Sequence, residues 1–200
     1  LSEFPEAPQA LKVDLSLGYQ RMADIAGGTG AINLGERAKA KNLYAEAKKQ
    51  ITSAYMLNPK DPATIRAYAK VYRQIGTFEW VSNLNFTEAL HHFLLAKKAL
   101  KGLLNSEFAS IDDRVMDGAL ALSLSQSARN VSDFDSAIAW ANEGINILNN
   151  LHQQYRSHYE TRFNLAHAYI YLGEAITTKV YEIGGDIQVA IAPFDQGKYH

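Results

Sequence analysis

Two distant segments of this chain carry the same spacing of large and small side chains. In each, a large residue and a small residue are followed three positions later by tyrosine and four positions after that by glycine. The copies are Tyr68, Ala69, Tyr72 and Gly76 in one segment and Leu165, Ala166, Tyr169 and Gly173 in the other. Spacings of three and four place side chains on one helix face, and small residues let a second helix approach closely. The repeat predicts stacked helical units.

Proline, glycine and helix-capping residues divide the chain into about eight helical segments. Ala, Leu, Lys, Glu and Gln fill the stretches between them, and runs of β-branched residues are few. The expected helices cover about 11–26, 36–57, 62–75, 87–104, 111–130, 133–150, 155–172 and 174–183. Thr87 and Asp133 are expected to be N-caps. Gly76 is expected to end the third helix, and 77–86 to be a long connection. The helices then form four antiparallel pairs.

These features resemble the tetratricopeptide repeat family, whose helix pairs stack into a right-handed superhelix. The Leu-Asn-Pro-x-Asp-Pro junction at 57–62 is the most similar piece, and the resemblance covers most of 11–183. The sequence departs from the family because the tryptophan usual early in the first helix is missing. The stretches 27–40 and 77–86 are longer than the repeat allows, and the last pair lacks a clean second helix.

The resemblance implies an all-α fold of about four antiparallel helix pairs, stacked as a right-handed α-solenoid. It places a single helical-repeat domain at 11–185, after an N-terminal extension at 1–10. The last segment, 186–200, is β-prone and contains Pro193, so we expect an extended C-terminal tail. An ordinary helical bundle with accidental alanine and aromatic periodicity is the alternative.

The composition excludes several classes of function. The chain has no cysteine, which excludes disulfides, thiolate metal sites, iron–sulfur clusters and a cysteine nucleophile. Its 20 Lys and Arg against 21 Asp and Glu give a net charge of −1, so we expect no nucleic acid partner. That balance averages a basic half, 1–100, with 13 cationic and 9 anionic residues, and an acidic half, 101–200, with 7 and 12.

The sequence leaves the compartment open. No apolar stretch approaches the about 20 residues that span a bilayer, so we expect a soluble chain without a transmembrane segment. The chain begins at Leu1, which suggests a processed product and a periplasmic or other extracytoplasmic location. The absence of cysteine fits an oxidising compartment and the cytoplasm equally well.

The linear sequence shows no catalytic or metal-binding pattern. No two of the six histidines lie four residues apart on a helix, as zinc ligands of that type require. Gly27, Gly28 and Gly30 follow a helix and lack the nearby lysine of a phosphate loop, so they indicate a helix end. We therefore expect no catalytic residue, no metal and no cofactor. An acid–base pair that converges from distant helices stays an open alternative.

Arg66, Lys70 and Arg73 form a cationic stripe on one face of their helix. In tetratricopeptide repeat proteins this face of the first helix in each pair lines a peptide-binding groove. Carried over to this sequence, the family's geometry predicts a groove lined by Tyr19, Met22, Arg66, Lys70, Arg73, Gln74, Gln126, Arg129, Asn130, Phe163, His167 and Tyr171. The alternative is that the charges only keep an exposed helix face in solution.

The resemblance implies a non-enzymatic scaffold that binds a protein or peptide segment in this groove. The cationic stripe favours an acidic partner. The alternative function is a soluble or periplasmic accessory component of a transport or secretion system. Its enclosed small-ligand pocket would be lined by Tyr19, Trp80, Phe163 and Tyr171. As an extended segment, the tail 186–200 would occupy either the groove of its own molecule or that of a neighbouring copy, and the second case would produce a homo-oligomer.

Overall fold

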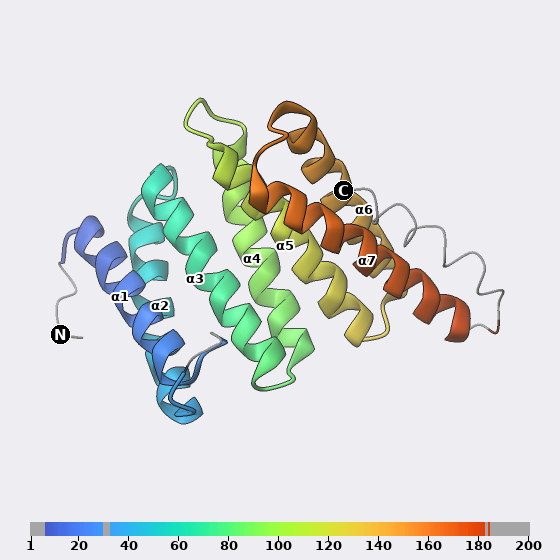
Figure 1. Ribbon diagram of the computed structural model, residues 1–200. Helices are drawn as coiled ribbons and strands as arrows, with labels where there is room; N and C mark the ends of the chain where they lie inside the picture. The colour runs from blue at the N-terminus through green and yellow to red at the C-terminus, as the bar shows by residue number, and fades with distance from the viewer. Residues whose placement is uncertain (1–6, 30–32, 183, 185–200) are drawn as a thin grey trace. The chain divides into compact units, whose positions relative to one another are not determined.

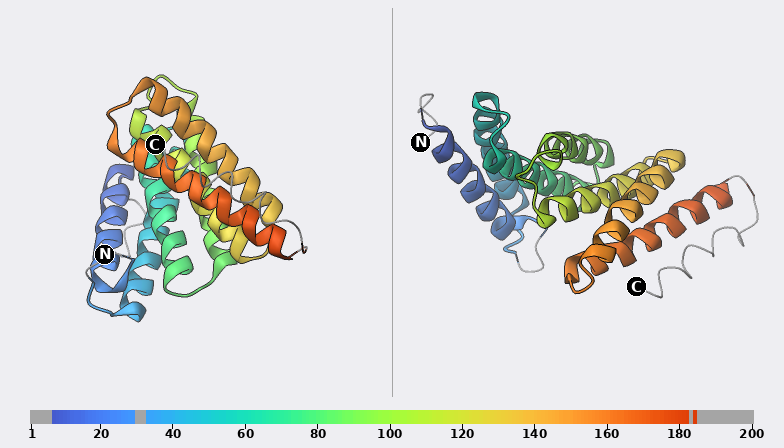
Figure 2. Two further views of the ribbon diagram at one scale, coloured as in Figure 1. Left: turned by 45° about the vertical axis from the view of Figure 1, so that its right-hand side comes forward. Right: turned by 90° about the horizontal axis from the view of Figure 1, so that it is seen from above.

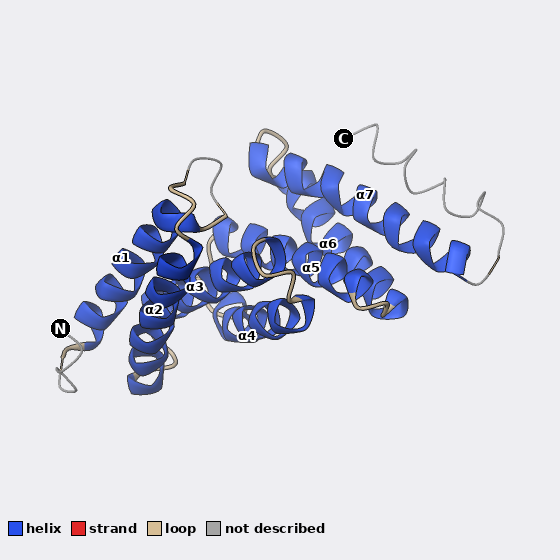
Figure 3. Ribbon diagram, turned by 90° about the horizontal axis from the view of Figure 1, so that it is seen from below, coloured by secondary structure: helices blue, strands red, loops and turns tan. Residues whose placement is uncertain are grey.

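The computed structural model describes residues 7–29, 33–182 and 184, and over these residues the chain forms seven α-helices and no strand (Figures 1 and 3). The helices are α1 (Gln9–Gly27), α2 (Arg37–Leu57), α3 (Pro62–Val81), α4 (Phe86–Leu104), α5 (Ile111–Asn130), α6 (Phe134–Gln154) and α7 (Tyr159–Glu182). This confirms the all-α prediction for the described residues. No helix among them is both long and apolar enough to span a membrane.

The chain divides into two compact units, Leu1–Phe108 with α1 to α4 and Ala109–His200 with α5 to α7. The prediction of one domain over 11–185 stays a prediction. The helix α1 begins at Gln9, inside the predicted extension, and residues 1–6 lie outside the described part of the chain. The predicted tail at 186–200 lies outside it as well.

Side-chain caps explain where several helices begin. Asp61 accepts a hydrogen bond from the backbone N–H of Thr64 at 2.8 Å, and Pro62 follows at the first helical position. Ser110 and Asp113 form a reciprocal capping box at the start of α5. Asp133 caps α6, as predicted. The predicted cap at Thr87 is wrong, because Asn85 caps α4 and Thr87 lies inside that helix.

The predicted end of the third helix at Gly76 is also wrong. The helix α3 continues to Val81, so most of the expected loop 77–86 is helical. Gly76 serves packing instead, because a Cβ atom there would lie only 2.7 Å from the ring of Phe93 on α4. The glycine thus lets the aromatic ring of one helix press against the backbone of its partner.

The prediction of an eighth helix at 174–183 is wrong as well. The helix α7 runs unbroken from Tyr159 to Glu182 with Gly173 buried inside it. A glycine within a helix costs about 1 kcal/mol relative to alanine, which buried neighbours such as Leu172 and Ala175 offset by packing. The described residues therefore form three helix pairs and one long single helix, instead of four pairs.

In the first unit, α1 packs against both α2 and α3, and α3 packs against α4 (Figures 1 and 2). Ile51, Phe78 and Leu100 are fully buried between these helices. In the second unit, α7 covers the pair formed by α5 and α6. The core between these three helices includes Leu148 and Leu165, both without exposed surface.

His92 is a polar residue in the core of the first unit, with only 4% of its surface exposed. Its ring meets the edge of Tyr72, with the ring centroids 5.6 Å apart. Burial, together with the nearby charge of Lys48 on α2 and a smaller effect of His91, lowers the pKa of His92 from 6.5 to about 4, and Glu88 on α4 opposes the change. His92 is therefore neutral in the folded protein near pH 7.

We expect His92 to make the first unit less stable in acid. Between pH 6.5 and about 4 the unfolded chain protonates this imidazole and the folded chain does not, so stability is complete above pH 6.5 and declines below it. The loss should be about 2 kcal/mol between pH 7.5 and 4.5. Urea denaturation gives the free energy of unfolding of the wild type and of His92→Phe at both pH values. The loss due to His92 is the drop between the two pH values in the wild type minus the drop in His92→Phe. His91→Phe is the control: His91 is exposed and is only a minor cause of the lowered pKa of His92, so this variant should keep most of the acid sensitivity. Equal acid sensitivity of all three proteins would contradict the prediction.

Candidate functional site

An exposed row of aromatic side chains follows one face of α7. Tyr159, Phe163, His167 and Tyr171 occur at every fourth residue, and each ring contacts the next. The successive centroid distances are 6.0, 4.3 and 5.8 Å. Tyr159 and Phe163 are 66% and 51% exposed, and the other two rings are half-buried. We call these four residues the aromatic ladder; it extends over about 18 Å of helix.

The helix backbone orients one ring of the ladder, that of His167. Nδ1 of His167 lies 2.9 Å from the carbonyl oxygen of Phe163, one turn earlier. Because a carbonyl only accepts, Nδ1 carries the proton in this contact, and Nε2 is the nitrogen left to face outward. The ladder thus combines apolar ring faces with one imidazole that can exchange hydrogen bonds with a ligand.

An ion pair lies at the C-terminal end of the ladder. Arg129 on α5 meets Glu174 on α7 with N and O atoms 3.0 Å apart. Burial raises the pKa of Tyr171, the carboxylate of Glu174 raises it further, and Arg129 acts in the opposite direction. All three groups are therefore close together, and the tyrosine hydroxyl stays protonated as a hydrogen-bond donor.

The second unit thus unites four of its six predicted groove residues: Phe163, His167, Tyr171 and Arg129. The other two lie on α5, where Gln126 is half-buried and Asn130 is exposed. The side-chain amide of Asn130 donates to the carbonyl of Gln126 at 2.9 Å, so it is used inside its own helix.

The six predicted residues of the first unit are spread over α1 and α3. Tyr19 is half-buried and Met22 exposed on α1, while Lys70 is exposed on α3. Gln74 donates to Asp24 of α1 at 3.2 Å, so its amide joins two helices.

The cationic stripe on α3 also has a structural role. The guanidinium of Arg66 donates to the carbonyl oxygen of Phe108 at 2.6 Å and so holds the segment after α4. Arg73 is half-buried, and its carbonyl accepts from Thr77 at 2.9 Å. Of the three cations, Lys70 is the one with an exposed side chain.

Trp80 was expected in a loop, but it lies in the last turn of α3. Its ring meets Phe86 edge-on at 6.5 Å. Tyr19 and Trp80 belong to the first unit, whereas Phe163 and Tyr171 belong to the second. The enclosed pocket that these four residues were expected to line stays a prediction.

Two residues of this site, Tyr159 and Glu174, were missed by the sequence reasoning. Tyr159 was within reach of a simple rule, because it continues the four-residue spacing of the other aromatic residues toward the N-terminus. The predicted helix break at Gly173 puts Glu174 on a separate helix, whereas in the unbroken α7 it lies one turn beyond Tyr171 on the same face.

No group of three or more His, Asp or Glu side chains in residues 7–29, 33–182 and 184 is placed to hold a metal ion. The aromatic ladder offers ring faces and hydrogen-bond donors that contact side chains of another chain well. No protein-family model matches this sequence, and no curated protein matches it either.

Proposed function

We propose that this chain is a non-enzymatic interaction scaffold that binds a protein segment on the aromatic ladder. The observation that carries the proposal is the ladder itself: four ring systems in continuous contact on an exposed helix face. Apolar side chains scattered singly on a surface are ordinary, whereas a contiguous row of them indicates a contact surface. Tyrosine and phenylalanine are also enriched at the centres of protein interfaces.

The ladder fits a segment that presents apolar side chains at regular intervals. Tyr159 and Phe163 supply large contact areas that lose little conformational entropy on binding, because each ring has only two rotatable bonds. Glu174 and Arg129, at the C-terminal end of the ladder, can bind polar groups of the partner segment that flank its apolar side chains. The occupant is thus a short helix or an extended peptide with apolar anchors.

We further propose that the helix pairs follow the tetratricopeptide plan within each unit. In that plan the first helix of a pair contacts its own partner and the first helix of the next pair. The helix α1 packs on α2 and α3, and α5 packs on α6 and α7, which supports the proposal. On this plan the exposed Lys70 belongs to the groove side of α3, and its positive charge favours binding of an acidic segment there.

A peptide selection tests the function directly. Peptides selected from a random display library for binding to the wild-type protein should bind the double variant Tyr159→Ala, Phe163→Ala at least tenfold more weakly, because interface energy concentrates in central aromatic residues. Fluorescence anisotropy with the selected peptides measures the affinity. Circular dichroism establishes that the variant keeps its helices.

Tyr181→Ala is the matched control, since Tyr181 is also on α7, is 84% exposed and lies outside the ladder. Its affinity for the same peptides should equal that of the wild type. Equal weakening by the control and by the double variant, or no weakening by either, would show that the ladder is not the binding surface.

A further inference from the structure

The first unit carries a basic hollow on its surface. It has a volume of about 670 Å³ and lies along α2, on a side other than the packing side that contains Ala47 and Ile51. Its lining residues are Lys12 from α1 and Ala45, Lys48, Lys49, Thr52, Ser53, Met56 and Leu57 from α2. Three of the eight are lysines and none is acidic, so the hollow has a positive potential that attracts anions.

Four of the polar side chains of the basic hollow make contacts within the fold. Lys12 is only 5% exposed, and its ammonium group donates to the hydroxyl of Ser53 at 2.8 Å. The hydroxyls of Thr52 and Tyr72 lie 2.9 Å apart. The ammonium of Lys48 lies 5.8 Å from the ring centroid of Tyr72. Because Lys12 is buried and hydrogen-bonded, it has already lost most of its rotamer freedom, so it loses little further entropy when an anion binds.

The opposite end of the basic hollow is apolar. Met56 and Leu57 lie one turn beyond Ser53 on α2 and are 76% and 59% exposed. Along α2 the basic hollow therefore runs from Lys48 and Lys49, through two hydroxyls with Lys12 beside them, to a pair of exposed apolar side chains. This order matches a ligand with an anionic head and a short apolar tail.

We propose that the basic hollow binds a phosphate monoester that carries an apolar group. A phosphate monoester has close to two negative charges near neutral pH and three terminal oxygens that accept several hydrogen bonds at once. Lysines act as point charges toward phosphate, and the Thr52 and Ser53 hydroxyls supply further donors. A single carboxylate would use fewer of these donors and balance less of the charge. The apolar group then covers Met56 and Leu57.

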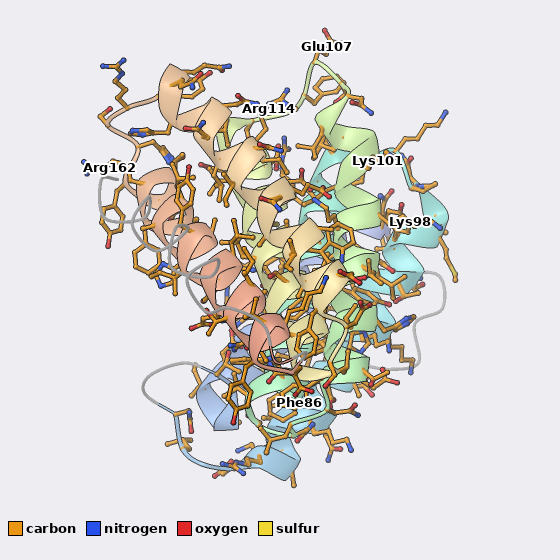
Figure 4. The ribbon with its side chains drawn as sticks, turned by 90° about the vertical axis from the view of Figure 1, so that its right-hand side faces the viewer. Phe86, Lys98, Lys101, Glu107, Arg114 and Arg162 are labelled. Carbon is orange, nitrogen blue, oxygen red and sulfur yellow. The ribbon has the colours of Figure 1, made fainter. Side chains whose placement is uncertain are left out.

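Titration with hexyl phosphate, followed by amide NMR shifts of α2, tests this site. The double variant Lys48→Gln, Lys49→Gln should bind at least tenfold more weakly, and Ser53→Ala about threefold more weakly. The control is Lys98→Gln, Lys101→Gln, which removes the same charge from the exposed residues of α4 marked in Figure 4. This control should bind hexyl phosphate like the wild type.

Two further probes identify the source of the phosphate monoester. Inorganic phosphate should bind more weakly than hexyl phosphate, because it leaves Met56 and Leu57 uncovered. Binding to vesicles with phosphatidic acid, lost in Lys48→Gln, Lys49→Gln, would assign the ligand to a membrane lipid. Binding of hexyl phosphate without vesicle binding would assign it to a soluble compound. The proposal is wrong if neither hexyl phosphate nor the phosphatidic acid vesicles bind. It is also wrong if the control Lys98→Gln, Lys101→Gln loses as much affinity as Lys48→Gln, Lys49→Gln.

Discussion

Gly118→Val should lower the free energy of unfolding of the second unit by about 3 kcal/mol, because the helix pair α5 and α6 has no room for a side chain there. A Cβ atom at this position would lie 2.7 Å from Cγ of Leu148 on α6. The contact is reciprocal, since a Cβ at Gly144 of α6 would lie 2.7 Å from Cδ2 of Leu122 on α5. Leu148 is fully buried and cannot swing aside. Urea denaturation with amide hydrogen exchange of α5 and α6 measures the loss.

The matched control is Gly18→Val on α1, an exposed helix position where a Cβ would meet nothing within 4 Å. It should change stability by no more than about 0.5 kcal/mol, and in the stabilising direction. Adding Leu148→Ala to Gly118→Val makes space for the new side chain, so the double variant should lose at least 1 kcal/mol less than the sum of the single losses. Strict additivity would show that the clash is not the cause.

The same glycines show which part of the fold the sequence predicts. The periodicity of small residues predicts four helix pairs, of which three are present in the described residues, and the helix limits near prolines and capping residues lie within a few residues of those observed. A glycine in a helix is ambiguous, however, because it marks an end when its φ is positive and a close contact when a neighbouring helix presses on it. Gly76 and Gly173 were interpreted as helix ends. Gly76 is a close-contact glycine because the ring of Phe93 presses on it, and only the tertiary structure shows that Phe93 is its neighbour.

The candidate sites depend on the sequence in different ways. Three of the four residues of the aromatic ladder are predicted by the resemblance to the tetratricopeptide repeat family, and their four-residue spacing places them on one helix face. The basic hollow was not foreseen. Lys12 is a charged residue on the buried side of α1, and the sequence does not reveal that Ser53 on another helix accepts its hydrogen bond. Contacts between side chains of different helices depend on helix rotation and register, which single-helix patterns leave undetermined.

A buried polar network joins three helices of the first unit around Asp24. One of its carboxylate oxygens accepts from the hydroxyl of Tyr44 on α2 at 2.5 Å and from the amide of Gln74 on α3 at 3.2 Å. The other accepts from Gln20, one turn earlier on α1, at 2.5 Å. Burial raises the pKa of Tyr44, and the hydrogen bond to Asp24 raises it further, so the hydroxyl remains a donor. Gln20 and Tyr44 are almost fully buried, whereas Asp24 and Gln74 are half-buried, so water has little access to two of the three donors.

Asp24→Ala should therefore destabilise the first unit by about 3 kcal/mol, because it leaves a buried hydroxyl and two amides without their acceptor. Tyr44→Phe removes only one of the three donors and should cost about 1 kcal/mol. Asp14→Ala is the control, since Asp14 is an exposed carboxylate on the same helix, and it should stay within about 0.5 kcal/mol of the wild type. Urea denaturation, together with amide hydrogen exchange of α1, α2 and α3, measures the loss of stability in all three variants. A cost for Asp24→Ala no larger than that for Asp14→Ala would mean that helix packing alone, without the carboxylate, holds α1, α2 and α3 together.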